Sequence, residues 1–182
     1  MAPISRRALF VGRFQPFHRG HQEAILHILR ETEELIIVIG SAQKSHEVDN
    51  PFTAGERIMM IQGALNAKNV EAARYYLIPI PDSSMHVLWT SQVIAYCPNF
   101  DVVYTNEPLT RCLFKEAKRE VKPIPMLQRE IYCATEIRER MLHDRNWQQL
   151  VPSSVVEVIE DINGINRLKD LIRSDSPFPI HR

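Results

Sequence analysis

Several features that mark common protein classes are scarce or missing in this sequence. Its 22 basic and 22 acidic residues cancel, so no overall charge favours a nucleic-acid or membrane partner. No apolar run approaches the ~18 residues of a membrane-spanning helix. No signal-type apolar segment follows the N-terminus. We therefore expect a cytoplasmic chain without a nucleic-acid or membrane partner.

Cysteine is also scarce. The three cysteines, at positions 97, 112 and 133, are odd in number and lack the spacing of a zinc site. Neither C-x-x-C nor H-E-x-x-H accompanies them, so the sequence predicts no metal site built from protein side chains. The motif G-x-G-x-x-G is missing from the first predicted turn, which argues against a dinucleotide-dependent oxidoreductase.

The remaining composition is that of a chain with a substantial core. With 182 residues, 45% of them hydrophobic, the chain suits one domain, and no repeat or low-complexity linker divides it. We expect this domain to span residues 1–173, with 147–172 as a helical cover. Residues 174–182, which have two prolines and no periodicity, are expected to be a tail.

Short apolar runs alternate with helical patterns along the chain. This is the order of an α/β protein with a parallel sheet flanked by helices. Two capping-box patterns, Thr53–Glu56 and Ser154–Glu157, predict helix starts near residues 54 and 155. Asn163-Gly164 is expected to end a helix. The predicted strands are 8–12, 35–40, 75–79, 101–104 and 120–124.

The segment Gly12-Arg-Phe-Gln-Pro-Phe-His-Arg-Gly-His21 lies where the first predicted strand turns into the first predicted helix. A helix N-terminus favours anions, because it exposes unpaired N–H groups and the positive end of the dipole. His18 and His21, three residues apart, share one helix face. Gly20 lets a ligand approach the backbone, and Arg13 can offer a bidentate fork. The tetrapeptide also fits a capping loop with solvated histidines, so other features must decide.

A second constellation, Thr135-Glu-Ile-Arg138, precedes an amphipathic stretch and predicts another helix start. Thr135 can cap this helix, and Arg138, one turn in, can swing back toward whatever the first loop binds. In an open α/β sheet, loops at the carboxyl ends of the strands meet in one cleft. We expect both constellations to lie in that cleft.

With these two segments the chain resembles the H-x-G-H nucleotidyltransferases, whose second signature is Ser-x-Thr-x-x-Arg. It is most similar to the archaeal-type nicotinamide mononucleotide (NMN) adenylyltransferases, over roughly residues 8 to 172. One departure is Cys133 where the family usually has Ser, and a thiol is the weaker donor. Further matching segments are Gly40-Ser-Ala-Gln-Lys-Ser-His46, Pro51-Phe-Thr-Ala-Gly-Glu-Arg57, Tyr75-Tyr-Leu-Ile-Pro-Ile-Pro-Asp82, Leu88-Trp89 and Val151-Pro-Ser-Ser-Val-Val-Glu157.

The resemblance implies a Rossmann-like nucleotidyltransferase fold and a reaction in which NMN attacks the α-phosphorus of ATP, giving NAD and pyrophosphate. It implies Mg²⁺ held mainly by substrate phosphates, and a homo-oligomer such as a dimer or hexamer. The catalytic residues would be Arg13, His18, His21 and Arg138. ATP would meet Gly12, Phe14, Gly20, Lys44, His46, Arg57, Cys133 and Thr135; NMN would meet Gly40, Ser41, Asp82, Trp89, Thr105 and Asn106.

Several alternatives stay open on the sequence alone. Trp89, implied to stack on the nicotinamide ring, has apolar neighbours and also fits a core residue. Arg57 also fits a surface ion pair. The phosphate motifs would serve an acceptor such as flavin mononucleotide, phosphopantetheine or glycerol phosphate equally well. Cys133 would fit a nucleotide sensor without turnover.

Overall fold

A five-stranded parallel sheet in the order β3-β2-β1-β4-β5 organises the fold. The computed structural model describes residues 5–125 and 132–173, so the expected tail at 174–182 lies outside the described residues. The expected α/β class with a parallel sheet is confirmed. The strands are β1 (Ser5–Gly12), β2 (Thr32–Ile39), β3 (Tyr75–Pro79), β4 (Val102–Tyr104) and β5 (Glu120–Lys122).

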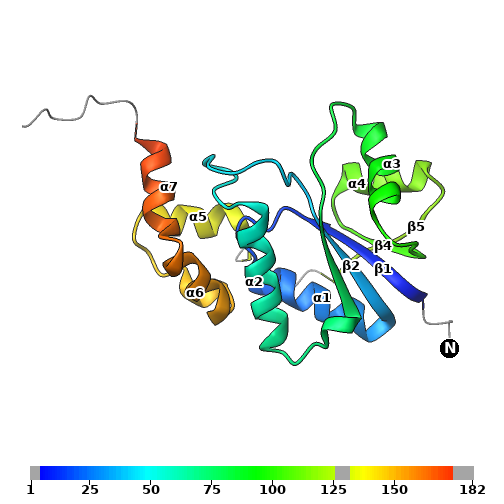
Figure 1. The fold of residues 1–182 in the computed structure, drawn as a ribbon, viewed down its shortest axis with the longest axis horizontal. Coiled ribbons are helices and arrows are strands. Elements are labelled where there is room, and N and C mark those ends of the chain that lie inside the picture. The colour runs from blue at the N-terminus through cyan, green and yellow to red at the C-terminus, as the bar shows by residue number, and fades with distance from the viewer. Residues whose placement is uncertain (1–4, 126–131, 174–182) are drawn as a thin grey trace, which may run out of the picture.

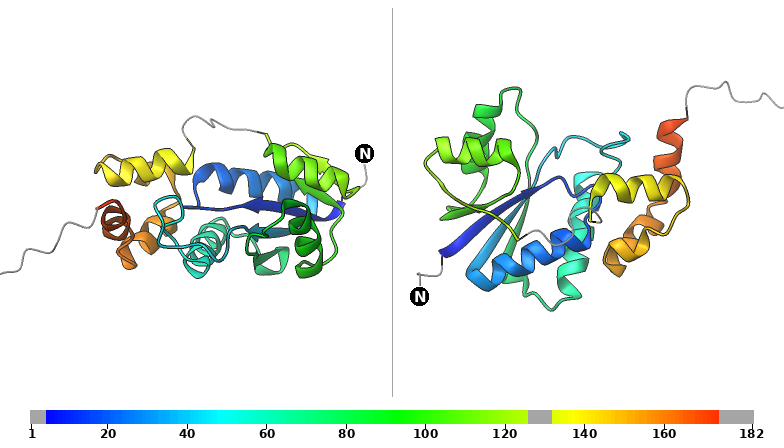
Figure 2. Two further views of the ribbon diagram at one scale, coloured as in Figure 1. Left: turned by 90° about the horizontal axis from the view of Figure 1, so that it is seen from above. Right: turned by 180° about the vertical axis from the view of Figure 1, so that it is seen from behind.

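Helices follow the strands and flank the sheet (Figure 1). Helices α1 and α2 lie on opposite sides of the sheet (Figure 2, left). The last helices, α5 to α7, lie at the end of the molecule away from α3 and α4 (Figure 1). Their bounds are α1 (Arg19–Glu31), α2 (Ala54–Asn66), α3 (His86–Tyr96), α4 (Pro108–Glu116), α5 (Ala134–Leu142), α6 (Ser153–Asp161) and α7 (Gly164–Ile172), with short 3-10 turns η1 (Ala72–Arg74) and η2 (Gln148–Leu150).

Strands β1 and β2 lie inside the sheet and are buried on both faces, which explains their continuous apolar sequence. Alternate residues of β1 enter different hydrophobic clusters: Ala8 and Phe10 join Ile25 of α1, whereas Leu9 joins a cluster with Val93 and Phe114. This alternation follows from the period of two in a strand. The sheet therefore separates two hydrophobic cores, and the loops at the carboxyl ends of its strands extend from this packed sheet.

Helix starts follow the sequence in one case and depart from it in another. Thr53 caps α2 through a complete capping box with Glu56, as predicted. The second predicted box is wrong, because α6 begins at Ser153 with Pro152 as its N-cap. The Ser154 hydroxyl is buried without a hydrogen-bond partner among the described residues. Asn163 takes a left-handed φ of 54° after α6, which is the helix end that Asn163-Gly164 predicted.

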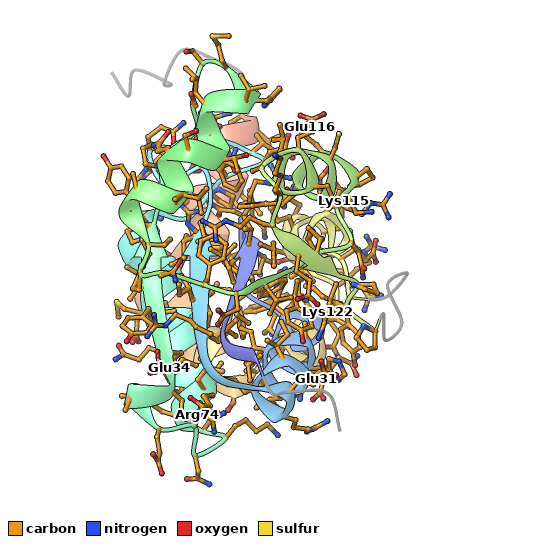
Figure 3. All side chains as sticks on the ribbon, turned by 90° about the vertical axis from the view of Figure 1, so that its right-hand side faces the viewer. Glu31, Glu34, Arg74, Lys115, Glu116 and Lys122 are labelled. Atoms are coloured by element: carbon orange, nitrogen blue, oxygen red, sulfur yellow. The ribbon has the colours of Figure 1, made fainter. Side chains whose placement is uncertain are left out.

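Charged side chains of both signs, among them Glu31, Glu34, Arg74 and Lys122, lie on the side of the molecule drawn in Figure 3. Lys115 and Glu116 lie together at the surface (Figure 3). Lys122 Nζ lies 3.8 Å from Glu120 Oε1, and the Tyr104 hydroxyl donates to Glu31 Oε2 at 2.6 Å. None of the helices in residues 5–125 and 132–173 is long and apolar enough to cross a membrane.

Candidate active site

The first loop brings His18 and His21 into direct contact at the start of α1. His18 is the N-cap, and its Nδ1 accepts the backbone N–H of His21 at 3.3 Å. His21 Nδ1 accepts the backbone N–H of His18 at the same distance. The rings stack with centroids 3.5 Å apart. The shared face predicted from their spacing is therefore present, in the form of a capping box made by two imidazoles.

These reciprocal bonds fix how the two rings can donate. Because each Nδ1 accepts a backbone N–H, each neutral ring carries its proton on Nε2. Burial lowers the pKa of His18 to about 4. Burial, and then the neighbouring His18, hold the pKa of His21 well below its usual range. At neutral pH the pair therefore offers two uncharged Nε2–H donors.

Aromatic packing holds His21 in place. Its ring meets Phe14 edge-on at 4.8 Å and stacks on Phe17 at 5.6 Å between centroids. Phe14, assigned to ATP from the resemblance, lines the first cavity and also supports this ring. A side chain at Gly20 would come within 2.9 Å of Tyr132 Cβ and 3.2 Å of the His18 ring, so only glycine fits without a shift.

The late helix α5 completes the first cavity from the opposite end of the chain. Its N-cap is Cys133, so the expectation that Thr135 caps this helix is wrong. Thr135 lies inside the first turn and lines the cavity. Arg138 is nearly buried and donates to the carbonyl oxygen of Gln15 at 2.9 Å. That bond joins the two sequence constellations, while contact of Arg138 with a ligand of the first loop stays a prediction.

Cys133 is exposed at the helix start. Burial of part of the thiol would raise its pKa, but the backbone N–H groups of Glu136 and Thr135 and the charge of Arg138 hold that pKa below its usual value. The same groups would favour any anion at this point. The substitution of Cys for Ser therefore keeps an anion-favouring position.

The first cavity, of about 440 Å³, is where most of the phosphate-directed residues meet. The two histidines and the two arginines lie on its wall together with Gly20. Ile124, Pro125 and Tyr132 add an apolar part. Of the residues expected at ATP or in catalysis, those lining this cavity are Arg13, Phe14, His18, Gly20, His21, Cys133, Thr135 and Arg138.

A second cavity, of about 570 Å³, adjoins the first. Of the residues expected at NMN, Gly40, Ser41, Asp82 and Trp89 line it. The Ser41 hydroxyl donates to Asp82 Oδ1 at 2.9 Å, which orients the carboxylate. Trp89 is half-buried and meets Phe114 edge-on at 6.1 Å, so part of its ring packs and part faces the cavity.

Among the residues that the structure describes, three line both cavities, and Arg13 is the charged donor among them. It is exposed, and Val11 and Glu107 are the other two shared residues. Glu107 caps α4 by accepting the N–H groups of Leu109 and Thr110. Sequence reasoning missed Glu107, although an acidic residue before Pro108 is a readable helix-start signal.

Some expected site residues lie elsewhere. Arg57 is fully buried and lines neither cavity; its guanidinium donates to the carbonyl oxygens of Arg13, Gly40, Ser41 and Thr53 at 2.8 to 3.2 Å. Burial first, and then the charge of Arg13, lower its pKa to about 10. It therefore holds the site's backbone rather than facing the cleft or forming a surface ion pair.

The other departures concern exposed loops and the fourth strand. Within the described part of the chain, Lys44 and His46 lie outside both cavities; Lys44 Nζ is 3.9 Å from Asp82 and His46 contacts Ser45 Oγ. Gly12 lines the second cavity rather than the first. Thr105 and Asn106, expected at NMN, line the first cavity instead.

No group of three or more His, Cys, Asp or Glu side chains among residues 5–125 and 132–173 is arranged to hold a metal ion. The Asn106 amide is also engaged, since it donates to the Ile124 carbonyl at 2.6 Å and accepts the Ile124 N–H at 3.0 Å. The donors that line the first cavity include the guanidinium groups of Arg13 and Arg138, the two imidazoles, and the hydroxyls of Thr105 and Thr135, and the Glu107 carboxylate lies beside them. Such donors suit an anionic ligand.

Comparison with known proteins agrees with this geometry. Residues 9–140 match a family described as cytidylyltransferase-like. The nicotinamide-nucleotide adenylyltransferase of Methanolobus tindarius is 50% identical over 173 residues, which are 95% of this chain and 98% of that protein. The protein of the same name from Thermoplasma volcanium is 51% identical over 173 residues, with 95% and 96% covered. The resemblance noted in the sequence motifs is confirmed.

A solved structure shares the fold. The bifunctional NMN adenylyltransferase/ADP ribose pyrophosphatase of Francisella tularensis, complexed with AMP and a Mn ion, has a TM-score of 0.79 and 21% sequence identity to this chain. The match covers 92% of this chain and 52% of that one, so this chain spans about half the length of that bifunctional protein. The expected Rossmann-like nucleotidyltransferase fold is confirmed.

Proposed function

Because the chain belongs to the cytidylyltransferase-like family, we propose that it is a nicotinamide-nucleotide adenylyltransferase, which joins ATP and NMN to give NAD and pyrophosphate. One structural observation carries this function best. Two cavities adjoin each other and share the cation Arg13 at their junction. One is lined by hydrogen-bond donors that suit phosphate, and the other by Asp82 and Trp89. Two phosphorylated substrates can therefore meet there.

The first cavity would hold ATP. The neutral Nε2–H groups of His18 and His21 would donate to phosphate oxygens, and the N-terminus of α5 with Arg138 would receive the pyrophosphate end. Arg13 would lie where the α-phosphate meets the acceptor. These roles need positioned donors rather than proton transfer, because a phosphate monoester is largely ionised above its second pKa of about 6.

The second cavity would hold NMN. Trp89 offers an aromatic face to the positively charged nicotinamide ring. Asp82, held by the Ser41 hydroxyl, can accept a hydrogen bond from the carboxamide or a ribose hydroxyl. The phosphate of NMN would then extend toward Arg13, attack the α-phosphorus in line, and displace pyrophosphate.

The donor set fits a divalent ion that is bound by the substrate rather than by the protein. The first cavity offers arginines, neutral imidazoles and N–H groups, and carboxylate clusters of three are missing from the described residues. Mg²⁺ held by the ATP phosphates would neutralise part of their charge. We propose that the protein acts in the cytoplasm and that it is a homo-oligomer.

Pyrophosphate release with ATP and Mg²⁺ tests the function. We expect release with NMN, accompanied by NAD, and none with flavin mononucleotide, phosphopantetheine or glycerol phosphate. Release with one of these other acceptors would keep the roles in the first cavity and discard those of Asp82 and Trp89. ATP binding without release for any acceptor would instead favour a nucleotide sensor.

A further inference from the structure

The guanidinium of Arg138 has two partners of different kinds. Nη1 donates to the carbonyl oxygen of Gln15 at 2.9 Å, and Nη2 donates to Asp49 Oδ1 at 2.7 Å. The Arg138 side chain is 6% exposed, whereas that of Asp49 is 75% exposed. A buried cation that lines the first cavity is thus paired with a carboxylate that stands mostly in water.

Asp49 lies at the tip of a short turn that does not need its side chain. The backbones of Glu47 and Asn50 exchange two hydrogen bonds, of 3.2 and 3.0 Å, and form an isolated β-bridge. The Asn50 side chain adds a bond to Glu47 Oε2 at 3.0 Å. The Asp49 carboxylate can therefore release Arg138 while the turn stays closed.

Arg138 also keeps its place without Asp49. The Gln15 carbonyl holds Nη1, and Gln15 is itself fixed by two hydrogen bonds between its side-chain amide and the Phe52 backbone. A carboxylate and a phosphate use the same guanidinium N–H donors. Arg138 lines the first cavity, whereas Asp49 is not among the described residues that do.

We propose that Asp49 is an internal competitor of the triphosphate: its carboxylate engages Arg138 in the free protein and is displaced when ATP binds. The identity of the nucleotide rests on the proposed function. Because the Asp49 carboxylate is three-quarters exposed to water, we take the range of exposed ion pairs, which favour the paired state by a factor of only about two to five. A triphosphate, with more charge than a carboxylate, can overcome this. Because the free fraction of Arg138 is then about one third to one sixth, Asp49 weakens the apparent affinity for ATP about three- to sixfold.

Calorimetric titration with ATP, and separately with inorganic tripolyphosphate, tests this without an acceptor or turnover. Asp49→Asn removes the charge and keeps the size; Glu47→Gln, in the same turn, removes an equal charge that does not contact Arg138. We expect Asp49→Asn to bind both ligands about three- to sixfold more tightly, and Glu47→Gln to bind them as the unsubstituted protein does. The gain should shrink at high salt.

Three results would overturn the proposal: unchanged or weaker binding by Asp49→Asn, an equal gain in Glu47→Gln, or no binding of either ligand. Thermal melting checks that each variant is folded, and Asp49→Ser replaces Asp49→Asn if the amide disturbs the turn. Failure of the proposed function is a separate outcome. A protein that binds tripolyphosphate but makes no NAD still shows whether Asp49 competes with the ligand for Arg138.

Discussion

His18 and His21 each accept the other's backbone N–H at Nδ1, at 3.3 Å in both directions, so the Nε2–H group of each ring can donate to a ligand. The pair needs no proton from solvent to bind an anion, since both rings are neutral at pH 7. Nucleotide binding at this site should therefore depend on how the two rings are placed. The contacts of the described residues lead to four predictions.

Loss of one ring should remove most turnover. We expect His21→Ala to lower kcat/KM for NAD formation on the order of a hundredfold or more, because one preorganised donor to developing charge is lost. Circular dichroism and thermal melting check the fold. His143→Ala is the control, since His143 is the exposed C-cap of α5 and contacts Glu139. Near-normal activity of His21→Ala would remove this ring from the mechanism.

Acid should destabilise the fold through His18. Its pKa is about 4 when folded, against an ordinary 6.5. Between these values the unfolded chain binds a proton that the folded chain does not, so the free energy of unfolding falls as the pH is lowered. The loss is roughly 3 kcal/mol over the window and nil above pH 7.

Urea unfolding at pH 7 and pH 4.5 measures this effect. His18→Asn keeps a capping acceptor but does not titrate, so its unfolding free energy should fall less between the two pH values. His21 still titrates in that variant and leaves a residual slope. An equal fall in both proteins would show that the buried His18 ring does not govern acid stability.

Trp89→Ala should raise the KM for NMN and leave that for ATP unchanged, because the ring faces the second cavity. Trp89→Phe is the matched control, since it keeps an aromatic face and should recover most of the NMN affinity. Steady-state kinetics with each substrate varied in turn gives both values. Equal effects on the two KM values would assign Trp89 to packing against Phe114 instead.

Arg57→Lys should destabilise the protein by about 3 kcal/mol, because an ammonium group cannot reach all four carbonyl oxygens and leaves buried acceptors unpaired. Guanidinium chloride unfolding measures the loss, and Arg111→Lys, an exposed position on α4, is the control. Since Arg57 joins Arg13 to Gly40 and Ser41, the KM values for both substrates should rise. A free energy of unfolding equal to that of the Arg111→Lys control would contradict the role of Arg57 in holding the four carbonyl oxygens.

The sequence predicted features that depend on local pattern. The apolar run at Ala8 to Val11 predicted a buried strand, and the spacing of His18 and His21 predicted a shared helix face. Errors arose where several residue types could serve one role. Thr135 is the stronger capping residue by type, yet the N-cap lies two residues earlier, at Cys133, and the helix begins at Ala134. Ser154 likewise fits a cap but lies inside α6.

Long-range contacts could not be predicted in this way. No local signal indicates that Arg57 reaches back to the loops after β1 and β2, or that Asp49 pairs with a residue 89 positions later. Thr105 and Asn106 follow β4, as expected, but strand order places that edge beside the first cavity. Sheet order, which joins β1 to both β2 and β4, had to come from the structure.

Transfer of radiolabel tests the central claim most directly. The protein is incubated with NMN, Mg²⁺ and ATP labelled at either the α- or the γ-phosphorus, and the products are separated. The account predicts α-label in NAD and γ-label in pyrophosphate, with His21→Ala slow in both. Transfer of the γ-label to the mononucleotide, or pyrophosphate release without α-label in NAD, would contradict attack on the α-phosphorus at the junction of the two cavities.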